Sequence, residues 1–468
     1  MNSHSPLSGG LESAAKKLES RPSPLDFAAY LPWACGQLEI SLIPIINRIT
    51  ISDALRSNAT SGKDNKEETL NADIQSGSDF NDIIGGSSTY YASDFFHIDA
   101  VYDDSNNLIQ LKFKNKSTIP VTLFKLLTLI VQFQTCLKAI YINRGLNKSG
   151  LYQLNKVVNI AHITDIILDN TTVTEANYYI LLDDDSPLKY LSLSRCKLND
   201  TAVKMIALRL QHPSKASKTL TVLNLSSNKI SDEGAKYLGD TLRTNRQLAY
   251  LNLSGNLISD TGVDGILSSL ITFKLTTDEI NEKRARKLTY IQAKNKFINE
   301  TVERMYIEYE KKVAAKKKTF KVPTVTKRSK SIEASQDIDT SIGVMDEVWL
   351  EKAEAVAAEM VAPFQDPFSC ENIIVRDNVL YCYGNNTLRY LNLAYNNLSY
   401  YSVKKLHNVI SIQRDWDRKP KGLINVCIEG NQIPIFCKEL SDINVTLEIG
   451  LSRMQNASFI HKKKTGKK

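Results

Sequence analysis

The sequence lacks the features of a membrane-spanning or disulfide-stabilised protein. No part of the 468-residue chain reaches the roughly 18 uninterrupted apolar residues of a membrane span, and the most apolar window, 119–133, contains Lys125. The N-terminus has no apolar core of a secretory signal. The seven cysteines are scattered, odd in number and without a CxxC pair. We therefore expect reduced, mostly buried thiols in an intracellular protein, and neither a disulfide framework nor a zinc site.

Local signatures of catalysis are missing as well. The sequence contains no glycine-rich phosphate-binding loop, no GxGxxG after a predicted strand and no HExxH motif. Its six histidines are far apart along the chain. We therefore predict a protein that is not an enzyme and that has no catalytic residues, cofactor or metal site.

The positive net charge of +8 is concentrated in two segments. Residues 311–330 hold nine Lys and Arg and no acid, and residues 461–468 hold five Lys, so the rest of the chain is mildly acidic. Both segments are expected to be unstructured, because lysine density and Pro323 disfavour a packed core. Each is either a solvated linker or a contact for an acidic polymer such as a microtubule, a nucleic acid or an anionic membrane. The candidate electrostatic contacts are Lys316, Lys317, Lys318, Lys327, Arg328 and Lys330.

A repeated frame, L-x-x-L-x-L-x-x-N/C-x-L, dominates the middle of the sequence. Good matches begin at Leu188, Leu220, Leu248, Leu388 and Leu423, and weaker ones begin at Leu108, Leu137 and Ile163. The starts from Leu108 to Leu248 are 25 to 32 residues apart, and a long gap follows before Leu388. The repeats at Leu220 and Leu248 both continue as Ser-Asp-x-Gly into a helical apolar pattern. A fixed period of this length predicts a stack of similar structural units.

Each unit is expected to be a short strand followed by a helix. Alternate strand residues point to opposite sides, so Leu223 and Leu225 should face inward while Asn224 faces outward. Asn228 stands where the chain leaves the strand, and its amide can satisfy backbone groups that stacking would bury. One such unit cannot bury its apolar face alone, so neighbouring units must cover each other. The predicted fold class is an α/β solenoid.

The frame resembles the leucine-rich-repeat family, in its ribonuclease-inhibitor-like subclass. The resemblance implies a horseshoe with a parallel concave sheet and convex helices, interrupted by a helical, basic, partly disordered insertion. The expected divisions are a disordered N-terminus (1–25), a short pre-repeat segment (26–55), a disordered Ser/Asn/Asp-rich linker (56–94), a first block of repeats (95–275), a charged helix and basic insertion (276–345), a helix with closing repeats (346–460) and a basic tail (461–468).

The start of the insertion carries apolar residues at coiled-coil spacing. The seam consists of Leu288, Ile291, Asn295, Ile298, Val302, Met305 and Tyr309, in steps of three and four residues. Two interpretations remain open. The helix either packs on the convex helices or extends the preceding one, or it binds another chain.

The outward strand positions form the candidate protein-binding surface. Tyrosine offers contact area and a hydroxyl group at a low cost in side-chain entropy, which suits protein recognition. Alternatively, Asn and Ser merely tolerate exposure in twisted strands. The candidate residues are Tyr190, Ser192, Arg195, Asn224, Tyr250, Asn252, Tyr390, Asn392 and Tyr395.

The order of the segments carries a closer resemblance within this family, from "TLTVLNLSSNKISDEGAKYLGDTLRTNRQLAYLNLSGNLISDTG" through the charged insertion to "LRYLNLAYNNL". It implies a cytoplasmic, non-enzymatic scaffold or adaptor in cilia or flagellar axonemes. We predict that it binds a protein partner and that its basic segments add attachment to an acidic surface such as a microtubule. The alternative is a nuclear or RNA-associated regulator that uses "KKVAAKKK" and "KRSK" for localisation or nucleic-acid contact. An enzyme regulator would use the same concave face.

Overall fold

The computed structural model describes residues 21–38, 40, 43–52, 95–114, 118–183, 185–319, 337–434 and 436–449. The chain forms two compact units. The repeat unit comprises Met1–Ile271 and Gly384–Lys468, and the insertion unit comprises Thr272–Tyr383. Among the described helices, none combines the length and hydrophobicity needed to cross a bilayer.

A ten-stranded sheet runs through the repeat unit, and its strands follow one another in sequence order. Every neighbouring pair is parallel except β2 and β3, which are antiparallel. The predicted frame starting at Leu108 therefore begins at a hairpin, and two further strands precede it. The strands are β1 (Ile43–Thr50), β2 (Phe95–Tyr102), β3 (Leu108–Phe113), β4 (Ala139–Ile142), β5 (Asp165–Ile167), β6 (Tyr190–Ser192), β7 (Val222–Asn224), β8 (Tyr250–Asn252), β12 (Tyr390–Asn392) and β13 (Asn425–Cys427).

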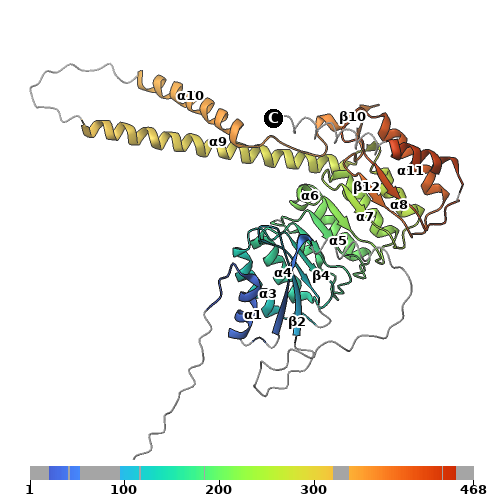
Figure 1. Ribbon diagram of the computed structural model, residues 1–468. Coiled ribbons are helices and arrows are strands. Elements are labelled where there is room, and N and C mark those ends of the chain that lie inside the picture. Colours follow the sequence, from blue (N-terminus) through green and yellow to red (C-terminus); the bar gives the residue numbers. More distant parts are fainter. Residues whose placement is uncertain are drawn as a thin grey trace, which may run out of the picture. The chain divides into compact units, whose positions relative to one another are not determined.

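Helices connect most of these strands, and Figure 1 shows them stacked in sequence order beside the sheet. The inward leucines of the frame pack between sheet and helices, and Leu220, Leu223 and Leu225 are fully buried, as predicted. The helices are α1 (Phe27–Gln37), α3 (Val121–Ile130), α4 (Lys148–Ala161), α5 (Asp200–Leu210), α6 (Ala216–Thr219), α7 (Asp232–Thr244), α8 (Asp260–Ser268) and α11 (Tyr400–Asp415), with short 3-10 turns η1 (Val131–Phe133) and η2 (Tyr178–Leu182).

The predicted asparagine ladder is present. The Asn228 amide nitrogen donates to the carbonyl oxygens of Leu193 and Leu225, both at 2.9 Å, and its oxygen accepts from the Leu198 backbone nitrogen at 3.0 Å. Each asparagine thus satisfies buried backbone groups of its own repeat and of the preceding one. The same pattern recurs at Asn256, Asn396 and Asn431. In the repeat with cysteine, the Cys196 thiol donates to the Leu168 carbonyl at 3.1 Å.

The Ser-Asp-x-Gly sequence links the start of one helix to the next. Ser231 caps α7, and Asp200 of the preceding repeat accepts hydrogen bonds from the Ser231 nitrogen (2.8 Å), the Ser231 hydroxyl (2.6 Å) and the Gly234 nitrogen (3.0 Å). A Cβ on Gly234 would lie 2.5 Å from the Asp200 Oδ1, so the glycine makes room for the carboxylate. Asp232 contacts Ser259 in the same way, and Asp260 contacts Ser399.

The repeat unit closes across the insertion. Strand β8 pairs directly with β12, which places Leu251 opposite Leu391. The Asn385 backbone nitrogen donates to the Ser269 carbonyl at 2.8 Å. Gly384 lies against the backbone of Leu270 so closely that a Cβ would come within 2.3 Å of its carbonyl carbon. The two ends of the repeat unit that flank the insertion are therefore adjacent, and the repeats form one continuous stack.

The insertion unit begins and ends in a small antiparallel sheet. Strands β10 (Ile373–Arg376), β11 (Val379–Cys382) and β9 (Phe273–Lys274) lie in that order, preceded by the turn η3 (Cys370–Asn372). Asp377 and Asn378 join β10 to β11 with positive φ angles of 48° and 57°, which is the geometry of a tight hairpin turn.

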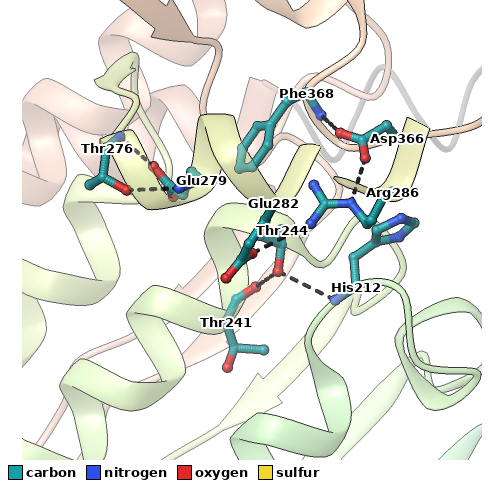
Figure 2. A network of polar contacts seen from close by, with 9 residues as sticks. All are labelled: His212, Thr241, Thr244, Thr276, Glu279, Glu282, Arg286, Asp366 and Phe368. Atoms are coloured by element: carbon teal, nitrogen blue, oxygen red, sulfur yellow. Dashed lines mark hydrogen bonds and ion pairs between the residues drawn. The ribbon is translucent and has the colours of Figure 1, made fainter. Parts of the chain in front are cut away.

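Two long helices, α9 (Thr277–Thr319) and α10 (Asp337–Met360), form the rest of this unit and run antiparallel side by side (Figure 1). Ile298 is buried with Ala353 and Ala357. Trp349 contacts the rings of Tyr306 and Tyr309 at centroid distances of 5.6 and 5.4 Å. Near the base of α9, Arg286 donates to Asp366 at 2.7 Å, and Asp366 also accepts from the Phe368 nitrogen at 2.9 Å (Figure 2).

The structure corrects three expectations for this region. Residues 311–319 continue α9 and are not unstructured, because lysine and alanine favour helix and no proline lies within 277–319. Helix α10 begins at Asp337, earlier than expected. Within its own unit α9 packs on α10, which neither interpretation of the seam predicted. Of the seam residues only Ile298 is buried, although Val302 packs beside it and Tyr309 contacts Trp349 of α10.

Candidate protein-binding surface

The register of the parallel strands aligns outward residues into two rows. The tyrosine row consists of Gln110, Ala139, Asp165, Tyr190, Val222, Tyr250, Tyr390 and Asn425. The amide row consists of Lys112, Tyr141, Ile167, Ser192, Asn224, Asn252, Asn392 and Cys427. Seven of the nine candidate residues therefore lie in two adjacent rows on one face of the sheet.

The tyrosines of this face are half-buried and rest on one another. The rings of Tyr250 and Tyr390 are 5.9 Å apart between centroids and inclined by 36°. Burial raises the pKa of Tyr250, and burial together with the Asp169 carboxylate raises the pKa of Tyr190. Both phenols stay neutral at physiological pH and can donate a hydrogen bond. The packed rings of Tyr250 and Tyr390 make a rigid contact surface.

Backbone hydrogen bonds fix the orientation of the amide row. The side-chain oxygens of Asn252 and Asn392 accept from the Ser254 and Ala394 nitrogens, both at 3.0 Å. Asn224 accepts from the Ser226 nitrogen in the same way, at 3.1 Å. Each amide nitrogen must then point away from its own turn. Asn252 and Asn392 consequently offer these nitrogens as donors on the exposed side of the sheet.

Ser192 does not contribute a free side chain to this face. It is fully buried, and its hydroxyl donates to Asp169 Oδ1 at 2.5 Å while accepting from the Asn224 amide nitrogen at 2.9 Å. Asp169, which the sequence frame did not single out, also accepts from the Ser194 nitrogen at 2.9 Å. It organises the polar end of the surface, and its signal in the sequence was an acid directly after a predicted strand.

Arg195 and Tyr395 occupy the turn that follows each strand. Both adopt positive φ angles, of 56° and 53°, and their backbone nitrogens donate to the next repeat. Arg195 is exposed, and the Tyr395 side chain is 68% exposed. Gly430 occupies the equivalent place one repeat later, where a Cβ would lie 2.3 Å from the Tyr395 ring. The ring leaves no room for a Cβ there, and the φ of 71° also favours glycine.

The candidate electrostatic residues are separate from this surface in the sequence. Lys316, Lys317 and Lys318 belong to the end of α9, whereas Lys327, Arg328 and Lys330 lie outside the described residues. Across the part of the chain that the structure describes, no three His, Cys, Asp or Glu side chains converge as metal ligands would. The seven cysteines are all free thiols, three of them buried.

Stacked strand-and-helix units, held by an asparagine ladder and exposing a flat row of side chains, define a repeat solenoid. Four segments, 185–207, 216–239, 244–267 and 384–406, match the family model described as Leucine Rich repeat. These four segments are therefore similar to leucine-rich repeats, and the fourth lies beyond the insertion. A comparison with curated proteins finds no match.

Proposed function

We propose that this protein is a non-enzymatic scaffold whose tyrosine and amide rows bind a segment of a protein partner. Leucine-rich repeats generally act as protein-interaction surfaces, which supports the class of function. The observation that carries the proposal is the juxtaposition of Tyr250 and Asn252 with Tyr390 and Asn392. These four residues combine packed aromatic rings with oriented amide donors, the chemistry that protein interfaces favour.

Affinity capture with paired variants tests this proposal. Tyr250→Ala with Tyr390→Ala should weaken capture of the partner at least about tenfold, because large aromatic residues dominate interface energetics. Tyr401→Ala is the matched control, since this side chain is 77% exposed and lies on helix α11. A partner retained equally by all the variants would exclude the two rows as its binding site. Circular dichroism should show the same helix content in each.

The cellular setting is proposed from a resemblance. The order of the segments is similar to that of leucine-rich repeat-containing protein 71, which favours a cytoplasmic scaffold in cilia or flagellar axonemes. Imaging of the tagged chain in ciliated cells tests this setting. Axonemal signal would support it, and nuclear signal would favour the nuclear or RNA-associated alternative.

The basic residues are proposed to strengthen attachment to an acidic surface such as a microtubule. Exposed cations act weakly one by one and are screened by salt, so many must act together. Replacing Lys316, Lys317, Lys318, Lys327, Arg328 and Lys330 by Gln should reduce co-sedimentation with microtubules without lowering the melting temperature. Unchanged co-sedimentation at low salt would refute this part of the proposal.

A further inference from the structure

Helices α9 and α10 leave large apolar side chains in solvent. Seven of them are between 41% and 57% exposed: Leu288, Ile291, Tyr306, Ile307, Tyr309, Val348 and Leu350. Exposed apolar residues at this density along a helix pair mark a surface that binds another protein. The charges on the same helices indicate which partner would fit this surface.

Helix α10 covers the α9 seam only from Ile298 to Tyr309. Ile298 packs on Ala353 and Ala357, whereas Leu288 and Ile291, two turns earlier on the same seam, stay exposed. At the other end, Leu350 is exposed beside Trp349, whose ring contacts Tyr306. The helix pair therefore has one apolar patch on each side of the level of Ile298.

The net charges on either side of that level have opposite signs. Toward the start of α9, after its acidic first two turns, the basic half carries Lys283, Arg284, Lys287, Lys294 and Lys296. Beyond Ile298, acids outnumber bases: the acidic half carries Glu300, Glu303, Glu308 and Glu310 on α9 and Glu347 and Glu351 on α10, against Arg304 and Lys352. Lys311 and Lys312 follow only after the acidic stretch. A partner that fits this helix pair must present the same two halves in reverse order.

We propose that the partner is a second copy of this chain, which packs its α9–α10 pair antiparallel on the first about a two-fold axis near Ile298. The axis sets the basic half of each copy against the acidic half of the other. Leu288 and Ile291 of one copy then pack on Tyr306 and Leu350 of its mate, and the mate repeats the contact in reverse. A parallel arrangement would instead place Lys287 against Lys287. The four helices form an antiparallel bundle of ordinary geometry.

The oligomeric state of the full chain tests the proposal. Light scattering behind size-exclusion chromatography should give a dimer mass at micromolar concentration. Leu288→Asp with Ile291→Asp should raise the dimer dissociation constant about a hundredfold, as expected when two central apolar contacts are replaced by charge. Leu257→Asp is the matched control, because this leucine is 58% exposed and lies in the repeat unit, and it should leave the dimer intact.

Charge reversal distinguishes this dimer from any other. Lys287→Glu with Lys294→Glu should weaken dimerisation, and adding Glu303→Lys with Glu308→Lys in the same chain should restore it. A wild-type chain that stays monomeric overturns the proposal. So does a dimer that survives Leu288→Asp with Ile291→Asp, or one that the four-residue exchange fails to restore. Failure of the tyrosine row to capture a partner would refute the proposed function but would leave the proposed dimer unaffected.

Discussion

Tyr250 and Tyr390 stand side by side in the sheet although the whole insertion unit lies between them in the sequence. Their strands pair in parallel, and their ring centroids are 5.9 Å apart. The asparagine ladder crosses the same boundary, because the Asn396 amide oxygen accepts from the Ile258 nitrogen at 3.2 Å. The repeat unit thus makes its own contacts across the point where the chain departs.

Excision of the insertion should leave the repeat unit folded. Replacing residues 272–383 by a short Gly-Ser linker removes no contact within the stack, since Gly384 already lies against Leu270. A shorter loop costs less closure entropy, so the free energy of unfolding should stay the same or rise by up to about 3 kcal/mol. Urea denaturation followed by circular dichroism measures it. A chain without a cooperative transition would contradict the continuous stack.

The glycines of the Ser-Asp-x-Gly sequence should be intolerant of alanine. In Gly234→Ala and Gly262→Ala the new Cβ would lie 2.5 Å from Asp200 Oδ1 and Asp232 Oδ1 respectively. Relief of these clashes should cost about 1–3 kcal/mol of unfolding free energy. Gly265→Ala is the control, because its Cβ meets nothing nearer than 3.6 Å and alanine favours helix by up to about 1 kcal/mol. Equal losses in all three variants would argue against the carboxylate contact.

Acid should weaken the link between the repeats that flank the insertion. Burial raises the pKa of Asp260, but hydrogen bonds from Ser399 and Ser402 outweigh it, so the pKa lies below its usual value. The carboxylate therefore stabilises the fold fully above the unfolded pKa of about 3.9, and this stabilisation is lost as pH falls through the folded pKa. The difference in unfolding free energy between wild type and Asp260→Asn should shrink accordingly in acid denaturation series.

A double-mutant cycle identifies the source of that pH dependence. In a chain carrying Ser399→Ala and Ser402→Ala, the effect of Asp260→Asn at neutral pH should be smaller, and the remainder is due to the backbone nitrogens of residues 399 and 402, which alanine keeps. An undiminished effect would mean that other groups hold the carboxylate.

The cysteines should differ sharply in reactivity. Burial raises the pKa of the Cys35 thiol to about 11, so it stays protonated at neutral pH, and the thiolate is the reactive form. Cys370 is exposed. Alkylation followed by mass spectrometry should label Cys370 in the folded protein and Cys35 only after denaturation. Labelling of both at equal rates would contradict the packing around α1.

The repeat frame predicted the strand positions because its leucines can be buried only on the side of the sheet that faces the helices. The frame also predicted that one row contains Tyr190, Tyr250 and Tyr390, since residues at the same place in parallel strands must align. Ser192 was misjudged, because its burial depends on Asp169 in the preceding repeat, and a frame treats each repeat alone. A periodic pattern identifies which residues repeat, but not the contacts that one repeat makes with another.

The repeat frame also failed to predict a second asparagine ladder, because this ladder too depends on contacts between repeats. Asn245 and Asn385 precede their strands and are fully buried. The Asn385 amide nitrogen donates to the Leu242 and Asn245 carbonyls at 3.0 and 2.7 Å. Between them in the sequence lies the insertion, so their spacing carries no visible period. The hairpin partner of α9 was hidden too, because heptad spacing marks a seam without naming the helix that covers it.

The hydrogen bonds between the first helical aspartate of one repeat and the N-cap serine of the next always run toward the C-terminus. They join Asp200 to Ser231, Asp232 to Ser259 and Asp260 to Ser399. In each case the aspartate of one repeat stabilises the helix N-terminus of the following repeat. Tyr400 stands where a fourth aspartate would fall, so the series of contacts ends at α11, although a further helical segment, 438–449, follows it. Damage to an early coil should therefore propagate toward the C-terminus, whereas fraying from the final coil leaves every upstream cap intact.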